Sequence, residues 1–147
     1  MQNLLWGFMA CSLGMTVLAV YAQDENKIQV RSLDLSRVKL NPREAELSRL
    51  DMPVVITDAE GLAEAFPDKG SQEAIAGQVD FRKEKLLFFR WAGSGGDRLT
   101  PKVQRGKENI VVVFHLSPGL TDDLRRHFYL FALPRGVKWK VAAQQYQ

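Results

Sequence analysis

Residues 79–99, VDFRKEKLLFFRWAGSGGDRL, decide the fold of this chain. Their middle, Leu86–Phe89 followed by Trp91, is an apolar run with no polar face, which is typical of a strand covered on both sides. The run stops at Gly93–Asp97, where a regular element continues only with the backbone freedom of glycine. We therefore expect the central strand of a small sheet, with Phe88 and Trp91 both buried and a glycine loop at the rim.

The first 22 residues are typical of a secretory signal peptide. The segment is apolar and uncharged, ends at Val20-Tyr21-Ala22 and turns abruptly polar at Gln23. Small or branched residues at the −3 and −1 positions predict cleavage after Ala22 and an exported domain, periplasmic or secreted, formed by residues 23–147. An uncleaved anchor is the alternative, because about 20 apolar residues can span a bilayer.

Cys11 is the single cysteine and lies inside this apolar segment. The preceding Phe8-Met9-Ala10 does not have the pattern of a lipoprotein signal, so lipidation is not expected. The mature chain then has no cysteine and cannot form disulfides, iron–sulfur clusters or cysteine-based zinc sites. It must be stabilised by its core, and residues 23–147 are enough for one domain to do so.

Between the signal and the central strand, the sequence predicts short helices. Asn41 followed by Pro42 starts one helix that could run to Leu50, and a polar connecting segment is the alternative. Asp58 can cap a helix over residues 59–66, and Ser71 another over residues 72–77. These two helices, 58–77, are expected to cover one side of the central strand.

The remaining patterns are those of strands. Alternation or β-branched runs predict strands at 52–57, 99–105, 110–116, 128–133 and 137–141. Residues 27–40 form either an edge strand, which must be bulged or broken near Ser32, or an extended lead-in. Pro101 favours an edge position for its strand. Helices that are segregated from the strands indicate an α+β fold. We expect one antiparallel sheet of five or six strands, mostly C-terminal, with two or three short helices before and against it.

The glycine loop contains two candidate catalytic residues, Ser94 and Asp97. A phosphate cradle would need a helix after the loop, whereas Leu99–Val103 is strand-like. A serine triad would need a histidine base such as His115 or His127, and the chain is short for the proteases that use one. A tight bend stabilised by Asp97 is the simpler interpretation. We assign no catalytic residue, with Ser94, Asp97 and His115 as the candidates if the protein is an enzyme.

Cofactors and metals have little support in the sequence. The two histidines are expected on different strands, and no cysteine accompanies them. Asp122 and Asp123 near His127 would make a carboxylate-rich corner, which a solvated loop explains equally well. No cofactor and no metal site are therefore predicted.

Charge is uneven along the chain. Residues 23–97 have a net charge of −3 and residues 98–147 a net charge of +6, which together give the +3 of the whole chain. The basic half could face an anionic partner, or its cations could simply occupy the solvent side of strands. The predicted binding residues are Arg125 and Arg126, in a charged loop over 122–126, the adjacent His127, and Arg98.

Two stretches resemble a known family. VDFRKEKLLFFRWAGSGGDRLT at 79–100 and DLRRHFYLFALPRGVKWKV at 123–141, with a valine-rich strand between them, resemble a family of short exported proteins of environmental bacteria, planctomycetes especially. The resemblance rests on the Trp-x-Gly-Ser-Gly loop and the Asp-Leu-Arg-x-His run. It implies an exported one-domain protein and supplies no catalytic residues. The order of elements is also remotely similar to a small accessory domain that stabilises a bacterial surface protease.

The function expected from these observations is binding without catalysis. The partner would be a protein or an anionic polymer, with no nucleic acid and no membrane after cleavage of the signal. The alternative is a small hydrolase or metal-dependent enzyme using the glycine loop and the histidines. An enzyme should bring His115 or His127 to Ser94 or Asp97 around a concave pocket, whereas a binding module should present an open basic surface.

Overall fold

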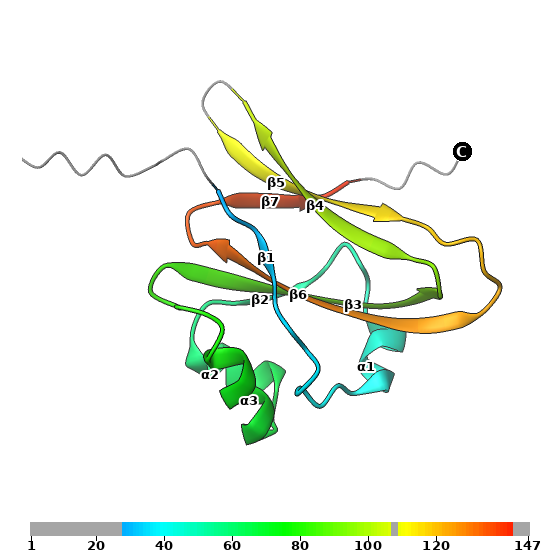
Figure 1. The fold of residues 1–147 in the computed structure, drawn as a ribbon, viewed down its shortest axis with the longest axis horizontal. Coiled ribbons are helices and arrows are strands. Elements are labelled where there is room, and N and C mark those ends of the chain that lie inside the picture. The colour runs from blue at the N-terminus through cyan, green and yellow to red at the C-terminus, as the bar shows by residue number, and fades with distance from the viewer. Residues whose placement is uncertain (1–27, 107–108, 143–147) are drawn as a thin grey trace, which may run out of the picture.

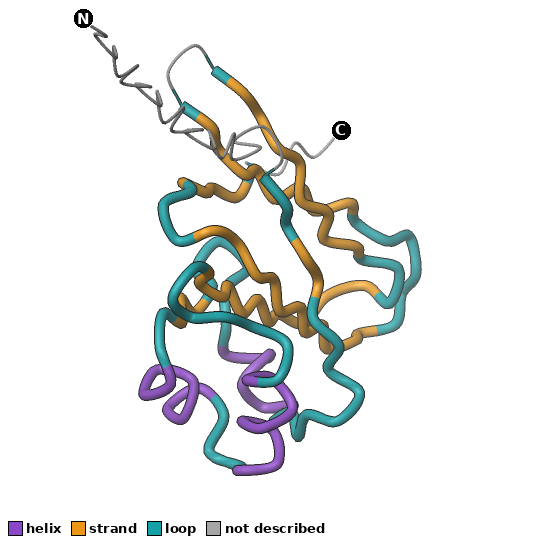
Figure 2. The backbone as a smooth tube through the Cα atoms, turned by 60° about the vertical axis from the view of Figure 1, so that its left-hand side comes forward, coloured by secondary structure: helices purple, strands orange, loops and turns teal. Residues whose placement is uncertain are grey.

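A computed structural model describes residues 28–106 and 109–142, and the side chains of Glu44, Glu46 and Leu47 are not described. The elements form three layers, with helices on one side, a first sheet in the middle and a second sheet on the other side (Figure 1). Figure 2 shows the helices gathered away from the second sheet. The signal peptide predicted for residues 1–22 lies outside the described residues.

The helices and strands follow the chain in the order expected. The helices are α1 (Pro42–Leu47), α2 (Ala59–Ala65) and α3 (Lys69–Ala76). The strands are β1 (Arg31–Ser32), β2 (Val54–Ile56), β3 (Glu84–Ser94), β4 (Arg98–Arg105), β5 (Ile110–Ser117), β6 (Leu124–Pro134) and β7 (Lys138–Val141). The mixed α+β class predicted from the sequence is confirmed.

The middle layer is built around β3. Its strands lie in the order β1-β6-β3-β2, and β3 pairs with β6 along its whole length, from Glu84 opposite Pro134 to Ser94 opposite Leu124. Alternate side chains of β3 enter two different cores, so Phe88 packs toward the helices and Trp91 toward the second sheet. Phe88 is 2% exposed and Trp91 5%. The prediction that this strand is interior and buried on both faces is confirmed.

The helices cover one face of the first sheet, as expected. Leu62 and Phe66 at α2 and Ile75 in α3 pack on Phe88, and the rings of Phe66 and Phe88 lie 4.8 Å apart. Asp58 caps α2 by accepting a hydrogen bond from the N–H of Gly61.

The cap predicted for the next helix was wrong. Asp68, not Ser71, caps α3, and its carboxylate accepts the N–H of Ser71. Ser71 lies in the first turn of the helix, fully buried, and its hydroxyl both donates to Asp68 and accepts the backbone N–H of Lys39. A buried hydroxyl with two partners serves the packing of α3 against the preceding segment.

The prediction of a single antiparallel sheet was wrong. The strands β4, β5 and β7 form a second sheet in the order β4-β5-β7, in which β4 and β5 are antiparallel but β5 and β7 are parallel. The turn after β6 does not close a hairpin. Instead it carries the chain from one sheet to the other, where Trp139 lies beside Val112. Pro101 lies in β4 at the edge of this sheet, as expected.

The second core lies between the two sheets. It consists of alternate residues of both inner faces, and aromatic rings fill its centre, with Phe89, Phe114 and Phe131 in mutual contact. Two sheets pack face to face in this way because each has an apolar inner face that must leave water. The clean alternation of β7 places Trp139 inward and its two lysines outward.

We expect Phe88→Ala and Phe89→Ala to lower the free energy of unfolding by similar amounts, about 3–5 kcal/mol each. The two rings occupy different cores, so each truncation leaves a cavity on its own side of β3. Urea denaturation measures both, with the partly exposed Val103→Ala as the control that should change little. A small effect at only one of the two phenylalanines would contradict a sheet buried on both faces.

Candidate functional site

Both sheets are tied together at one end by the carboxylate of Asp97. Asp97 follows the β3–β4 turn and is 8% exposed. One of its oxygens accepts the indole N–H of Trp91 at 3.1 Å and the other the backbone N–H of Gly119 at 2.8 Å. Asp97 thus joins β3 of the first sheet to the loop between β5 and β6. This agrees with the simpler interpretation of Asp97 as the residue that stabilises the bend.

Glycines at this end permit close approach of two backbone segments. A Cβ added to Gly119 would lie 2.5 Å from the Cα of Gly96, and one added to Gly93 would collide with the carboxylate of Asp97. The expectation that the loop needs the φ freedom of glycine was wrong, because no described glycine has a positive φ and β3 continues through Gly93 to Ser94. Glycine is required at these positions because the neighbouring atoms leave no room for a side chain.

Ser94 is engaged by the neighbouring loop and not by a histidine. Its hydroxyl donates to the carbonyl of Thr121 at 2.9 Å and accepts the N–H of Thr121 at 3.2 Å. His127 contacts the carbonyl oxygen of Ser94 through Nε2, at 2.8 Å. A carbonyl oxygen only accepts hydrogen bonds, so Nε2 carries a proton and donates it. This geometry holds a turn and does not activate the hydroxyl.

The second histidine lies on the opposite side of the second sheet. His115 pairs with Thr100, and both project from the outer face, whereas the carboxylate of Asp97 bonds to Trp91, whose side chain lies in the core between the sheets. Its Nε2 atom is buried without a hydrogen-bond partner. Of the candidate catalytic residues, Ser94 and Asp97 both line the cleft beside the end of β3, and His115 does not join them.

The predicted binding corner is a strand in the structure. The charged loop expected over 122–126 was wrong from Leu124 onward, because β6 begins there. Neighbouring residues of a strand point to opposite faces, so Arg125 and Arg126 cannot hold one anion between them. Arg125 pairs with Asp123 at 2.6 Å, and the ring of His127 stacks on Trp91 with centroids 4.7 Å apart.

Basic side chains gather instead on the outer face of the second sheet. The strand register places four exposed cations there, which we call the basic face: Arg98, Lys102, Lys138 and Lys140. Lys102 and Lys140 flank Val113 from the two neighbouring strands. No acidic residue occupies an outward position in the described parts of β4, β5 and β7, and no ion pair of the described residues engages these four cations. Of these four cations, only Arg98 was predicted from the sequence. Alternation along β7 shows that Lys138 and Lys140 point outward, but it does not show which strands lie beside them.

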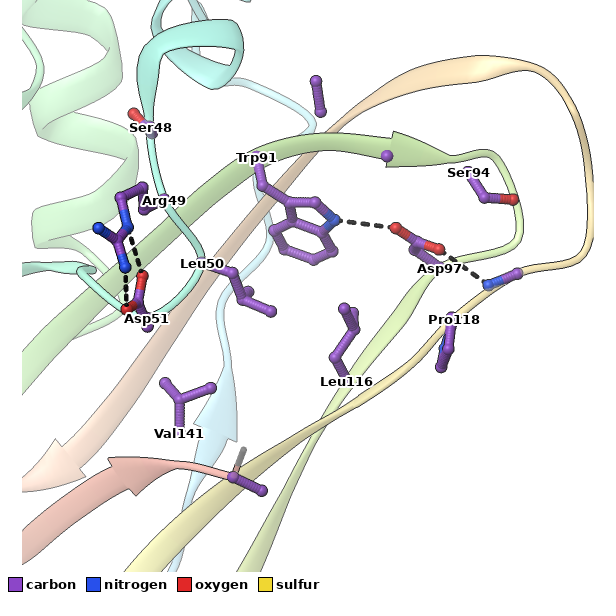
Figure 3. Close-up of a pocket in the computed structure, with 14 residues that line it drawn as sticks. Ser48, Arg49, Leu50, Asp51, Trp91, Ser94, Asp97, Leu116, Pro118 and Val141 are labelled. Atoms are coloured by element: carbon purple, nitrogen blue, oxygen red, sulfur yellow. Dashed lines mark hydrogen bonds and ion pairs between the residues drawn. The ribbon is translucent and has the colours of Figure 1, made fainter. Parts of the chain in front are cut away.

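A cleft opens between the two sheets beside the end of β3 (Figure 3). Its volume is about 830 Å³. The apolar wall is formed by Leu50, Leu116 and Val141, and Trp91 and Asp97 lie at its inner end. Arg49 and Asp51 form a two-pronged ion pair at the rim, with N–O distances of 3.0 and 2.7 Å. Neither histidine lines this cleft.

No group of three His, Cys, Asp or Glu side chains among the described residues could hold a metal ion. No helix in the same part of the chain is long and apolar enough to cross a membrane.

Comparisons of the chain with protein-family models, with curated proteins and with solved structures give no match. The resemblance to short exported bacterial proteins therefore stays a prediction.

We expect Asp97→Asn to lower the free energy of unfolding by about 1–3 kcal/mol, because an amide cannot accept both N–H groups that the carboxylate now accepts. Chemical denaturation followed by Trp91 fluorescence measures the change. Asp122→Asn removes the same charge from an exposed position and should have little effect. Equal losses in the two variants would contradict the bridging role of Asp97.

Asp123 should remain ionised in acid well below the ordinary range. Hydrogen bonds from the hydroxyl of Thr121 and from Arg125 lower the pKa of its carboxyl from 3.8 to about 2, and the N–H of Gly95 adds to the effect. A pKa lowered by folding stabilises the fold above pH 3.8, and that stabilisation is lost as the pH falls toward 2. NMR titration should show a higher pKa in Arg125→Ala and no change in Arg98→Ala. A carboxyl that titrates near 3.8 in the wild type would refute the network.

Proposed function

We propose that this chain is an exported binding domain, without catalytic activity, whose partner is an anionic polymer. The observation that carries the proposal is the basic face: four exposed cations on one side of a sheet, with no acidic residue at the outward positions of the described strands. The signal peptide expected at residues 1–22 supports export. The resemblance to short exported bacterial proteins also agrees with export.

A polymer is favoured over a small anion by the spacing of the cations. Residues two apart on a strand place their side chains about 6.6 Å apart, and strands separated by one neighbour lie about 9.5 Å apart. Lys138 and Lys140 follow the first spacing, and Lys102 and Lys140 the second, across β5. An array of separated charges suits a chain with repeated sulfate, phosphate or carboxylate groups better than one compact ion.

The charge asymmetry of the chain would orient the domain. Residues 98–147, which supply the whole second sheet, have a net charge of +6, whereas the preceding part of the mature chain has −3. A polyanion would thus be attracted to the second sheet and repelled from the helical side. At about 0.15 M salt the field extends only about 8 Å, so the contact is short-ranged and weakened by salt.

The corner formed by Arg125, Arg126 and His127 is less suited to bind the same partner. Asp123 neutralises Arg125, and the stacking of His127 on Trp91 holds its ring inside the fold. Arg98 of the predicted set belongs to the basic face and keeps its role in the proposal.

Retention on immobilised heparin tests the proposal. The Lys102→Ala, Lys140→Ala variant should elute at lower salt and bind heparin about tenfold more weakly, since it loses two favourable charge contacts. The matched control is Lys69→Ala, Lys83→Ala, which removes the same charge from exposed positions away from the second sheet.

Two outcomes would contradict the assignment. Equal weakening in the matched control would mean that retention reflects net charge and not a site. Greater weakening in Arg125→Ala, Arg126→Ala would place the site at the predicted corner.

A further inference from the structure

His115 lies among the cations of the basic face. It projects outward from β5, the middle strand of the second sheet, opposite Thr100 of β4. Its diagonal neighbours on this face are Arg98 and Lys102 of β4 and Lys140 of β7. Diagonal neighbours of an antiparallel pair are about 7–8 Å apart, a distance that long side chains span. The imidazole is therefore within reach of a polymer that contacts these cations.

The imidazole of His115 has a nitrogen without a partner. The Nε2 atom is buried and makes no hydrogen bond in the described part of the chain. A buried polar atom without a partner is uncommon in folded proteins and calls for an explanation. The side chain as a whole is only partly buried, so rotation of the ring about its side-chain bonds can bring Nε2 to the surface.

The charged groups around the ring cannot accept its proton. The ammonium and guanidinium groups of the three neighbouring cations are hydrogen-bond donors only. The outward positions in the described parts of β4, β5 and β7 hold no acidic residue. A negatively charged acceptor for a protonated ring is thus absent from the described residues of this face, and an anionic ligand would supply one.

We infer that His115 is a fifth binding residue of the basic face, which it joins in its protonated form, so that the polyanion is bound more tightly in acid. This inference rests on the proposed function. Histidine is the side chain whose charge ordinarily changes between pH 5 and 8. An acidic group of the polymer beside the ring stabilises the imidazolium, and by linkage the protonated ring binds the polymer more tightly. The Nε2–H group then donates a charge-assisted hydrogen bond to an oxygen of that group.

The other histidine of the chain, His127, is outside this face. Its ring stacks on Trp91, and its Nε2 atom donates to the carbonyl of Ser94 at the junction of the two sheets. The chain contains two histidines in all. His127 therefore serves as the control for protonation of a histidine that does not contact the polymer.

Binding of dextran sulfate at pH 5.5 and pH 7.5, at constant ionic strength, tests the inference. Sulfate esters stay ionised over this range, so a change in affinity comes from the protein and not from the polymer. The wild type should bind about fivefold more tightly at pH 5.5, the gain expected from one exposed charge contact. His115→Gln should lose this pH dependence, and His127→Gln should keep it. His115→Lys, with a permanent charge, should bind at pH 7.5 about as tightly as the wild type does at pH 5.5.

NMR titration of the wild type measures the same effect without a substitution. Dextran sulfate should keep the ring of His115 protonated to higher pH and have little effect on the ring of His127. Equal affinity at the two pH values, a pH dependence that survives in His115→Gln, or equal effects on the two rings would overturn the inference alone. Undiminished binding by Lys102→Ala, Lys140→Ala at both pH values would overturn the proposed function, and the inference with it.

Discussion

An apolar strand with no polar face must be covered on both sides, and the rest of this structure follows from meeting that constraint at β3. Its alternate side chains pack into two cores, one covered by α2 and α3 and the other by the second sheet. Burying a side chain such as Phe88 or Phe89 contributes about 1.5–3 kcal/mol, so leaving either face open would remove much of the stability of a domain this small. The three layers are the result.

The second sheet is held over β3 at one end by polar contacts and not by apolar packing alone. Asp97 accepts hydrogen bonds from Trp91 in β3 and from Gly119 in the loop between β5 and β6. The backbones of Gly96 and Gly119 lie so close together that a Cβ on Gly119 would collide with Gly96. Ser94 and His127, which suggested chemistry in the sequence, complete this junction through Thr121 and a carbonyl oxygen. Residues conspicuous in the sequence therefore serve the architecture.

The two sheets differ in the composition of their faces and in the length of their strands. The outward positions of the second sheet hold cations and no acids, whereas its inward positions are apolar, so alternation along each strand separates a charged face from a core. The cleft has another origin. β2 pairs only with Leu86–Phe88 of the longer β3, and residues 48–51 line a cleft beside the end of β3.

The sequence by itself determined the local elements, namely the buried central strand, the other strands and the helix cap at Asp58. Periodicity and capping depend on residues that are close in the chain, so they can be predicted without the tertiary structure. Only the tertiary structure decided which strands pair. Alternation shows that Trp139 is buried but not against what, so the split into two sheets and the parallel pairing of β7 with β5 were not predictable. The same reason applies to the site. Arg125 and Arg126 are adjacent in sequence but face apart, whereas Lys102 and Lys140 come together across β5 because sheet register joins residues that are distant in the chain.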